Sequence, residues 1–92
     1  MRNMKMALCE GRHEIPQATD GAIFPNSIDP LNTDWMHAHA KEILAECDAL
    51  DLYVTGLTVA LVEVIRVCVE NSIDLVLYHF DRVSGTYYPQ KF

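Results

Sequence analysis

The ten residues from 52 to 61 constrain the fold of this chain most strongly. A short apolar run at 52–54 is followed by Thr-Gly-Leu-Thr at 55–58, and helical periodicity begins immediately afterwards. This order predicts a β-strand, a tight turn and the start of a helix. In an open α/β sheet, ligands bind in the loops that follow the carboxyl ends of the strands. We therefore expect a small α/β protein with a ligand-binding edge.

The remaining elements extend this pattern along the chain. With 92 residues, we expect one domain, residues 1–92. The order β-α-β-α-β-β predicts three parallel strands, an antiparallel edge strand and two helices. Strands are expected at 4–9, 51–54, 73–80 and 86–88, helices at 34–47 and 58–71, and a long Pro-rich loop at about 12–32.

Charge and cysteine content limit the partners and the location of the protein. The formal net charge of −6 argues against binding to long duplex nucleic acid, because such contacts need many Lys and Arg side chains. The three cysteines lack CxxC spacing, so we expect buried free thiols in the cytoplasm. Polar residues interrupt the most apolar window, 54–69, and the N-terminus lacks a sustained apolar core. We therefore expect neither a membrane span nor a signal peptide.

Three polar loops follow the parallel strands, at 10–14, 55–58 and 79–85. Because the carboxyl ends of parallel strands meet at one edge of a sheet, we expect these loops to form a common site. The residues expected to bind a ligand there are Arg12, His13, Thr55, Gly56, Leu57, Thr58, Asp81 and Arg82.

Each part of this expected site also has a simpler structural interpretation. The hydroxyls and amides at 55–58 suit a phosphate or a ribose, but Thr58 or Thr55 equally suits a helix cap. Arg12 can clamp a phosphate, or the pair 12–13 is exposed and neutralised by its acidic neighbours. Asp81 can bind a ligand or cap its own turn, as Asp residues commonly do.

Two further pairs of residues bear on metal binding and assembly. His37 and His39 are two positions apart on a helix and point away from each other, so we expect no metal site, and no cofactor. Glu63 and Arg66 have the spacing of an ion pair, at a surface or at a dimer interface. The helix Val59–Val69 is apolar around its circumference, which predicts a homodimer that covers it.

Two segments resemble a known family. Asp51-Leu-Tyr-Val-Thr-Gly56, before an apolar helix, and Leu75-Val-Leu-Tyr-His-Phe-Asp-Arg-Val-Ser-Gly-Thr-Tyr-Tyr88 are similar to the core of small CRISPR-associated Rossmann-like (CARF-like) proteins. The similarity is greatest to the stand-alone ring nucleases of type III CRISPR systems, which bind and open cyclic oligoadenylate messengers. It covers about the C-terminal half and the strand 4–9. It implies ligand contacts from 55–58 and Asp81.

The same resemblance indicates binding more strongly than cleavage. Those small ring nucleases carry histidines on the helix after the Gly turn, whereas this chain has Glu63 and Arg66 there. We therefore expect a protein that binds a cyclic oligoadenylate-type messenger in antiviral defence or phage counter-defence, as a sponge or a ring nuclease. Ring opening would use the ligand's own 2′-hydroxyl and would require no metal.

An alternative expectation comes from a different functional class. A small phage-type inhibitor or interaction module would act on a host defence protein without any small-molecule ligand. In that case the net charge of −6 and the Pro-rich loop would form the active surface.

Overall fold

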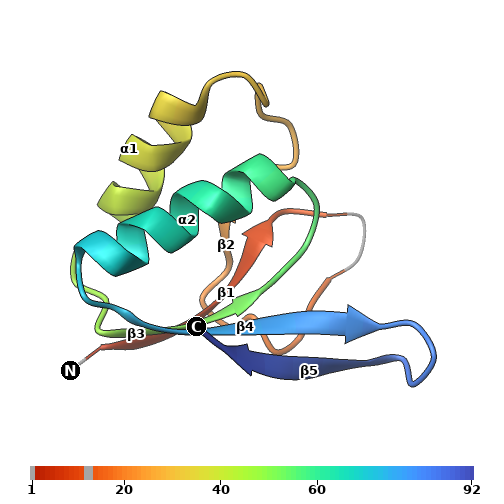
Figure 1. Cartoon of the computed structure of the whole chain (residues 1–92). Helices are drawn as coiled ribbons and strands as arrows, with labels where there is room; N and C mark the ends of the chain where they lie inside the picture. Colours follow the sequence, from red (N-terminus) through yellow and green to blue (C-terminus); the bar gives the residue numbers. More distant parts are fainter. Residues whose placement is uncertain (1, 12–13) are drawn as a thin grey trace.

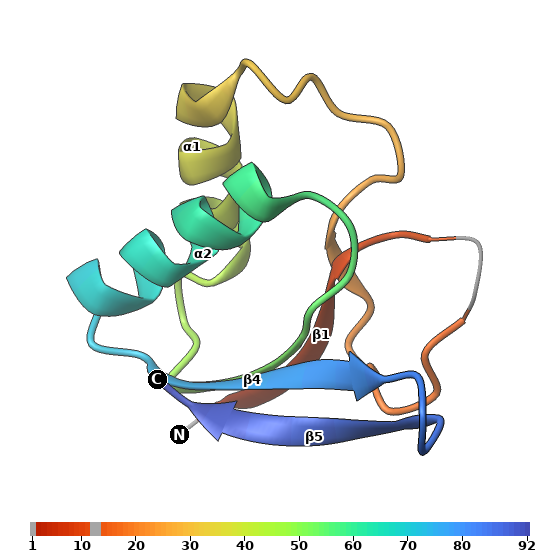
Figure 2. The same cartoon turned by 45° about the vertical axis from the view of Figure 1, so that its right-hand side comes forward.

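The protein is a five-stranded α/β sheet with two helices on one face (Figures 1 and 2). The computed structural model describes residues 2–11 and 14–92. The sheet order is β2-β1-β3-β4-β5, in which β2, β1, β3 and β4 are parallel and β5 is antiparallel to β4. This confirms the expected small Rossmann-like class. The elements are β1 (Asn3–Cys9), β2 (Ala22–Phe24), α1 (Thr33–Ile43), β3 (Ala49–Tyr53), α2 (Thr58–Glu70), β4 (Asp74–Asp81) and β5 (Thr86–Lys91).

Strand β2 lies within the segment that the sequence predicts as loop, so the sheet has four parallel strands and not three. Its three residues are too few to show a period in the sequence. Pairing with β1 supplies the missing stabilisation: the Ala7 N–H donates to the Gly21 carbonyl, and the Glu10 N–H donates to the Phe24 carbonyl, both at 2.9 Å. The Lys5 N–H also donates to Asp20 Oδ2 at 2.8 Å, which fixes the register.

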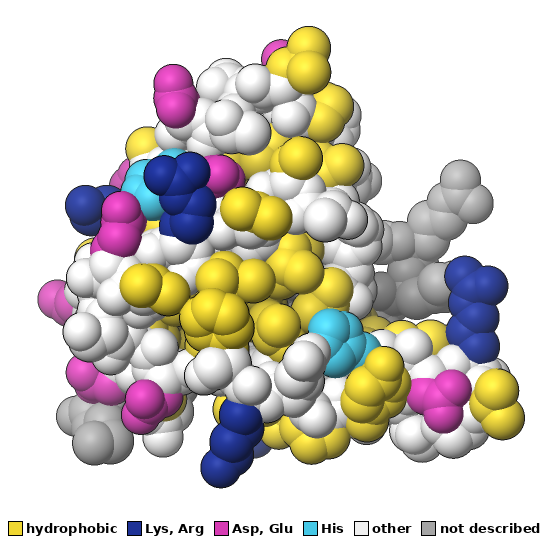
Figure 3. Space-filling model, in the orientation of Figure 1, with side chains coloured by type: hydrophobic (Ala, Val, Ile, Leu, Met, Phe, Trp, Pro, Cys, Tyr) yellow, Lys and Arg dark blue, Asp and Glu magenta, His cyan; other side chains and the backbone are white. Residues whose placement is uncertain are grey.

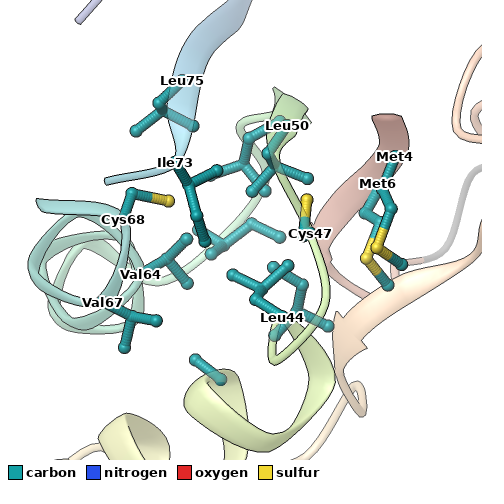
Figure 4. Packing of buried hydrophobic residues seen from close by; sticks show 14 of the residues in the cluster. Met4, Met6, Leu44, Cys47, Leu50, Val64, Val67, Cys68, Ile73 and Leu75 are labelled. Atoms are coloured by element: carbon teal, nitrogen blue, oxygen red, sulfur yellow. The ribbon is translucent and has the colours of Figure 1, made fainter. Parts of the chain in front are cut away.

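The core lies between the sheet and the two helices. Alternate residues of β1, β3 and β4 face the helices and are buried. Figure 4 shows these side chains converging with those of the helices. Burial raises the pKa of the Cys68 thiol to about 12, so this thiol is a packing group. The buried hydrophobic core includes the side chains of Met4, Met6, Leu8, Met36, Ala40, Leu44, Leu50, Leu52, Ala60, Val64, Val67, Leu75 and Leu77.

The two helices begin in different ways. Asn32 caps α1, since its Oδ1 accepts from the Trp35 N–H at 3.2 Å. The prediction that Thr58 or Thr55 caps α2 is wrong: the N-cap is Leu57, which has no side-chain hydrogen bond, and Thr58 is the first helical residue. Gly56, with a φ of +76°, turns the chain at this point. The Thr55 hydroxyl therefore bonds to β1 and not to the helix.

A group of ionisable side chains joins α1 to α2. His37 Nδ1 lies 3.1 Å from Glu63 Oε1, and His37 Nε2 lies 2.9 Å from Glu70 Oε1. Arg66 Nη1 lies 3.5 Å from Glu63 Oε2, which confirms the expected ion pair. His39 contacts the Ile23 carbonyl instead, at 2.9 Å, so the two histidines do have different neighbours.

The outer side of α2 exposes valines together with the charged Arg66 and Glu70. Val59, Val62 and Val69 are all exposed on it. Figure 3 shows hydrophobic side chains gathered over α2 and the β4–β5 hairpin beside it, where Tyr88 and Phe92 are exposed. No helix in the described ranges 2–11 and 14–92 has both the length and the hydropathy needed to cross a membrane.

Candidate functional site

Three cavities adjoin one another near the carboxyl edge of the parallel strands. Figure 1 shows this edge of the sheet on the right. We call them the central cavity, the helix-end cavity and the aromatic cavity. The central cavity shares Cys9, Glu10 and Asn26 with the helix-end cavity, and Glu14 and Thr55 with the aromatic cavity. This edge is where open α/β sheets bind ligands.

The central cavity, of about 480 Å³, lies at the end of β1. Ala7, Cys9 and Thr55 form part of its lining, and Glu10 and Glu14 bring two carboxylates to it. Both glutamates are exposed. This part of the edge is therefore acidic among the described residues, and it suits hydrogen-bond donors better than phosphates.

The helix-end cavity, of about 590 Å³, opens onto the start of α2. It is lined there by Gly56, Leu57 and Thr58, and opposite them by Asn26 and Ser27. Helix α2 has neither a side-chain cap nor an acidic residue in its first turn. The first N–H groups of a helix lack intrahelical partners and carry a partial positive charge. This cavity therefore suits an anionic group, with polar side chains to orient it.

Thr55 and Gly56 shape the turn that forms this cavity. The Thr55 hydroxyl donates to the Cys9 carbonyl at 3.0 Å, and its oxygen accepts from the Cys9 N–H at 3.3 Å. These bonds tie the end of β1 to the turn after β3. Gly56 supplies a positive φ that other residues rarely adopt. Ligand contact by these two residues stays a prediction, whereas their structural role is visible.

Cys9 lies beside the start of α2 but is not an activated nucleophile. Burial raises the pKa of the Cys9 thiol, and a hydrogen bond with the Leu57 backbone lowers it by less. The thiol therefore stays protonated at neutral pH, whereas catalytic cysteines react as thiolates. Cys9 contributes packing and shape to the two cavities it lines.

The aromatic cavity, of about 450 Å³, lies between Phe80 of β4 and Tyr87 of β5 on one side and the segment 14–16 on the other. Phe80 and Tyr87 are cross-strand neighbours, with ring centroids 5.3 Å apart and planes at 64°. Tyr87 also meets the ring of Tyr53 edge-on, at 5.2 Å. The walls are therefore apolar and aromatic, and Glu14 and Thr55 add polar groups.

Two of the expected site residues, Asp81 and Arg82, do not line these cavities. Asp81 Oδ1 accepts from the Val83 N–H at 3.1 Å, and Oδ2 accepts from the Ser84 hydroxyl at 2.9 Å. Asp81 thus caps its own turn, which is the simpler interpretation of this residue. Arg82 is exposed on the same hairpin. Arg12 and His13 lie outside the described residues.

The sequence did not single out several residues of these cavities. Asn26 and Ser27 lie in the expected loop and reach α2 only because β2 pairs with β1. Ile15 and Pro16, which belong to the same expected loop, lie beside Tyr87 in the aromatic cavity. The one available signal was the row of aromatic residues in β4 and β5, which the hairpin register places together.

Within the residues that the structure describes, no group of three or more His, Cys, Asp or Glu side chains is placed to hold a metal ion.

Searches of protein-family models, curated proteins and solved structures found no match to this chain.

Proposed function

We propose that the protein binds a nucleotide along this edge, with a phosphate in the helix-end cavity. One observation carries the proposal: an uncapped helix start and an aromatic cavity adjoin the same central cavity. Backbone N–H groups at a helix start are suited to phosphate oxygens. A short ligand held in this way needs few basic side chains, so the net charge of −6 is no obstacle.

The ligand we propose is a cyclic oligonucleotide messenger of the oligoadenylate type, in a cytoplasmic defence or counter-defence setting. The resemblance of 51–56 and 75–88 to CARF-like proteins supports this choice, and adjoining cavities suit a ligand larger than one nucleotide. We favour sequestration over ring opening. The helix after the Gly turn carries Glu63 and Arg66, whereas the ring nucleases that this chain resembles carry histidines there.

Thermal shift and calorimetry with cyclic di-, tri- and tetranucleotides test this function. A ligand at one hundred times its Kd should stabilise the protein by about 2.7 kcal/mol. Chromatography of the ligand after incubation then separates a sponge, which returns it intact, from a ring nuclease. No stabilisation by any of these ligands would contradict the proposal.

The variant Thr58→Asp tests where the phosphate binds. A carboxylate in the first turn of α2 stabilises the helix but repels an anion, so unfolding should not become easier while binding weakens by about tenfold. Thr33→Asp is the matched control, because it adds the same charge at the first residue of α1 and outside the cavities. Equal binding by both variants would remove the start of α2 from the site.

A protein-interaction module is the second candidate. The exposed apolar residues Val62, Val69, Tyr88 and Phe92 favour it, because monomeric proteins rarely expose large apolar patches. If none of the cyclic nucleotides stabilises the protein, this surface becomes the candidate binding site for a protein partner.

A further inference from the structure

We infer that the aromatic cavity holds the base of the bound nucleotide, and that Glu14 selects bases carrying an amino group. This inference deepens the proposed function and rests on it. It assigns a base subsite to Glu14 and Phe80, which lie in two of the loops expected to form the site but were not among the residues expected to bind the ligand.

The walls of the cavity suit a planar ring. Phe80 and Tyr87 present ring surfaces from two paired strands, and Ile15, Pro16 and Val54 complete an apolar lining. Proteins hold unstacked bases by stacking them on aromatic side chains or between apolar ones. The volume of about 450 Å³ is within the usual range of small-molecule sites.

The aromatic wall is held in place before any ligand arrives. Tyr87 packs edge-on against Tyr53, whose ring stacks on that of Tyr78 with centroids 4.7 Å apart. Tyr53 is buried, and Tyr78 and Tyr87 are half-buried. Phe80 is the exception, with half of its side chain exposed. A base placed against Phe80 would bury this ring without rearranging the others, and little conformational entropy would be lost.

The charge of the described lining residues favours a hydrogen-bond donor over a phosphate. Among the described residues, the lining of this cavity contains no Lys, Arg or His, and its one charged residue is Glu14. A carboxylate accepts hydrogen bonds and repels anions. Adenine and cytosine present exocyclic amino groups, whereas uracil presents a carbonyl oxygen at the corresponding position. Glu14 therefore favours adenine or cytosine over uracil.

The position of the cavity connects this subsite to the proposed phosphate site. Glu14 and Thr55 line both the aromatic and the central cavity, and Cys9 lines both the central and the helix-end cavity. A nucleotide with its base at Phe80 thus directs its sugar along the acidic central cavity. There the Glu10 carboxylate can accept from a ribose hydroxyl.

Calorimetric titration with adenosine 5′-monophosphate, uridine 5′-monophosphate and ribose 5-phosphate tests the inference. The adenine nucleotide should bind most tightly and ribose 5-phosphate most weakly. Phe80→Ala should weaken binding of the adenine nucleotide by about fivefold or more, the usual effect of losing one stacking contact, and leave ribose 5-phosphate unchanged. Glu14→Gln should reduce the preference for adenine over uracil.

Tyr88→Ala is the matched control for Phe80→Ala. Tyr88 is 52% exposed and Phe80 51%, but Tyr88 lies on the opposite face of the hairpin and lines none of the three cavities. The Tyr88→Ala variant should bind all three ligands as tightly as the parent protein does. If Phe80→Ala unfolds, Phe80→Leu serves instead, because it keeps an apolar side chain without a ring to stack.

The outcomes separate this inference from the function on which it rests. Equal affinity for ribose 5-phosphate and the adenine nucleotide, unaffected by Phe80→Ala, would overturn the base subsite and leave the phosphate site standing. If Phe80→Ala weakens binding and Thr58→Asp does not, the result would support the base subsite and overturn the phosphate placement. No binding of any ligand here or in the cyclic panel would overturn both.

Discussion

At the scale of single residues, Asp81 is held by the turn that follows it. Hydrogen bonds from the Val83 N–H and then from the Ser84 hydroxyl lower the pKa of this carboxyl. The carboxylate form therefore stabilises the folded turn above the ordinary pKa of an unfolded Asp, and this stabilisation is lost as the pH falls through the lowered value. The hairpin turn should loosen under acid conditions.

Ser84→Ala removes one of the two bonds, so the pKa of Asp81 should rise part of the way to its ordinary value. A pH titration of the Asp81 carboxyl by NMR measures this shift. Thr86→Val is the control, because it removes the other hydroxyl bonded to Ser84 and leaves both Asp81 contacts in place. An unchanged pKa in Ser84→Ala would show that the backbone N–H groups of Val83 and Ser84 account for the effect without the hydroxyl.

At the scale of elements, the sequence predicts those helices, strands and turns that depend on residues close together in the chain. Asn32 begins α1 and Gly56 permits the turn before α2, and both signals act within a few residues. Strand β2 was missed because pairing with β1 stabilises it, and no local pattern reports such pairing. The same pairing carries Asn26 to the helix-end cavity. The turn of the candidate site was therefore predictable, and the opposite wall was not.

The contact between α1 and α2 depends on a buried carboxylate. Glu63 is 6% exposed and is the one buried charged residue in the described part of the chain. Both nitrogens of His37 contact carboxylates, and both can donate only when both carry a proton. Arg66 provides the other contact of Glu63, at 3.5 Å. Glu63 thus has one partner on its own helix, Arg66, and one on the neighbouring helix, His37.

His37→Ala should lower the free energy of unfolding by about 1–3 kcal/mol, because it leaves a buried charged group with one partner fewer. Urea denaturation measures this loss. In a Glu63→Gln background, the same His37→Ala change should cost much less, since no buried charge remains. Equal losses in the two backgrounds would show that His37 acts through packing alone.

At the scale of the whole molecule, α2 exposes apolar side chains on its outer side. We propose a homodimer through α2, Val59–Val69, with the exposed rings of Tyr88 and Phe92 at its margin. In a two-fold dimer the same patch serves both partners. Each copy carries a net charge of −6, so added salt should screen the repulsion and strengthen association.

Val62→Glu should separate the dimer into monomers, because it places like charges opposite each other across the two-fold axis. Light scattering during size-exclusion chromatography measures the mass of each variant. Val83→Glu is the matched control: Val83 is 97% exposed on the hairpin turn, away from α2, and this change should leave the mass unaltered. A parent protein that is a monomer at every salt concentration would overturn the proposed homodimer.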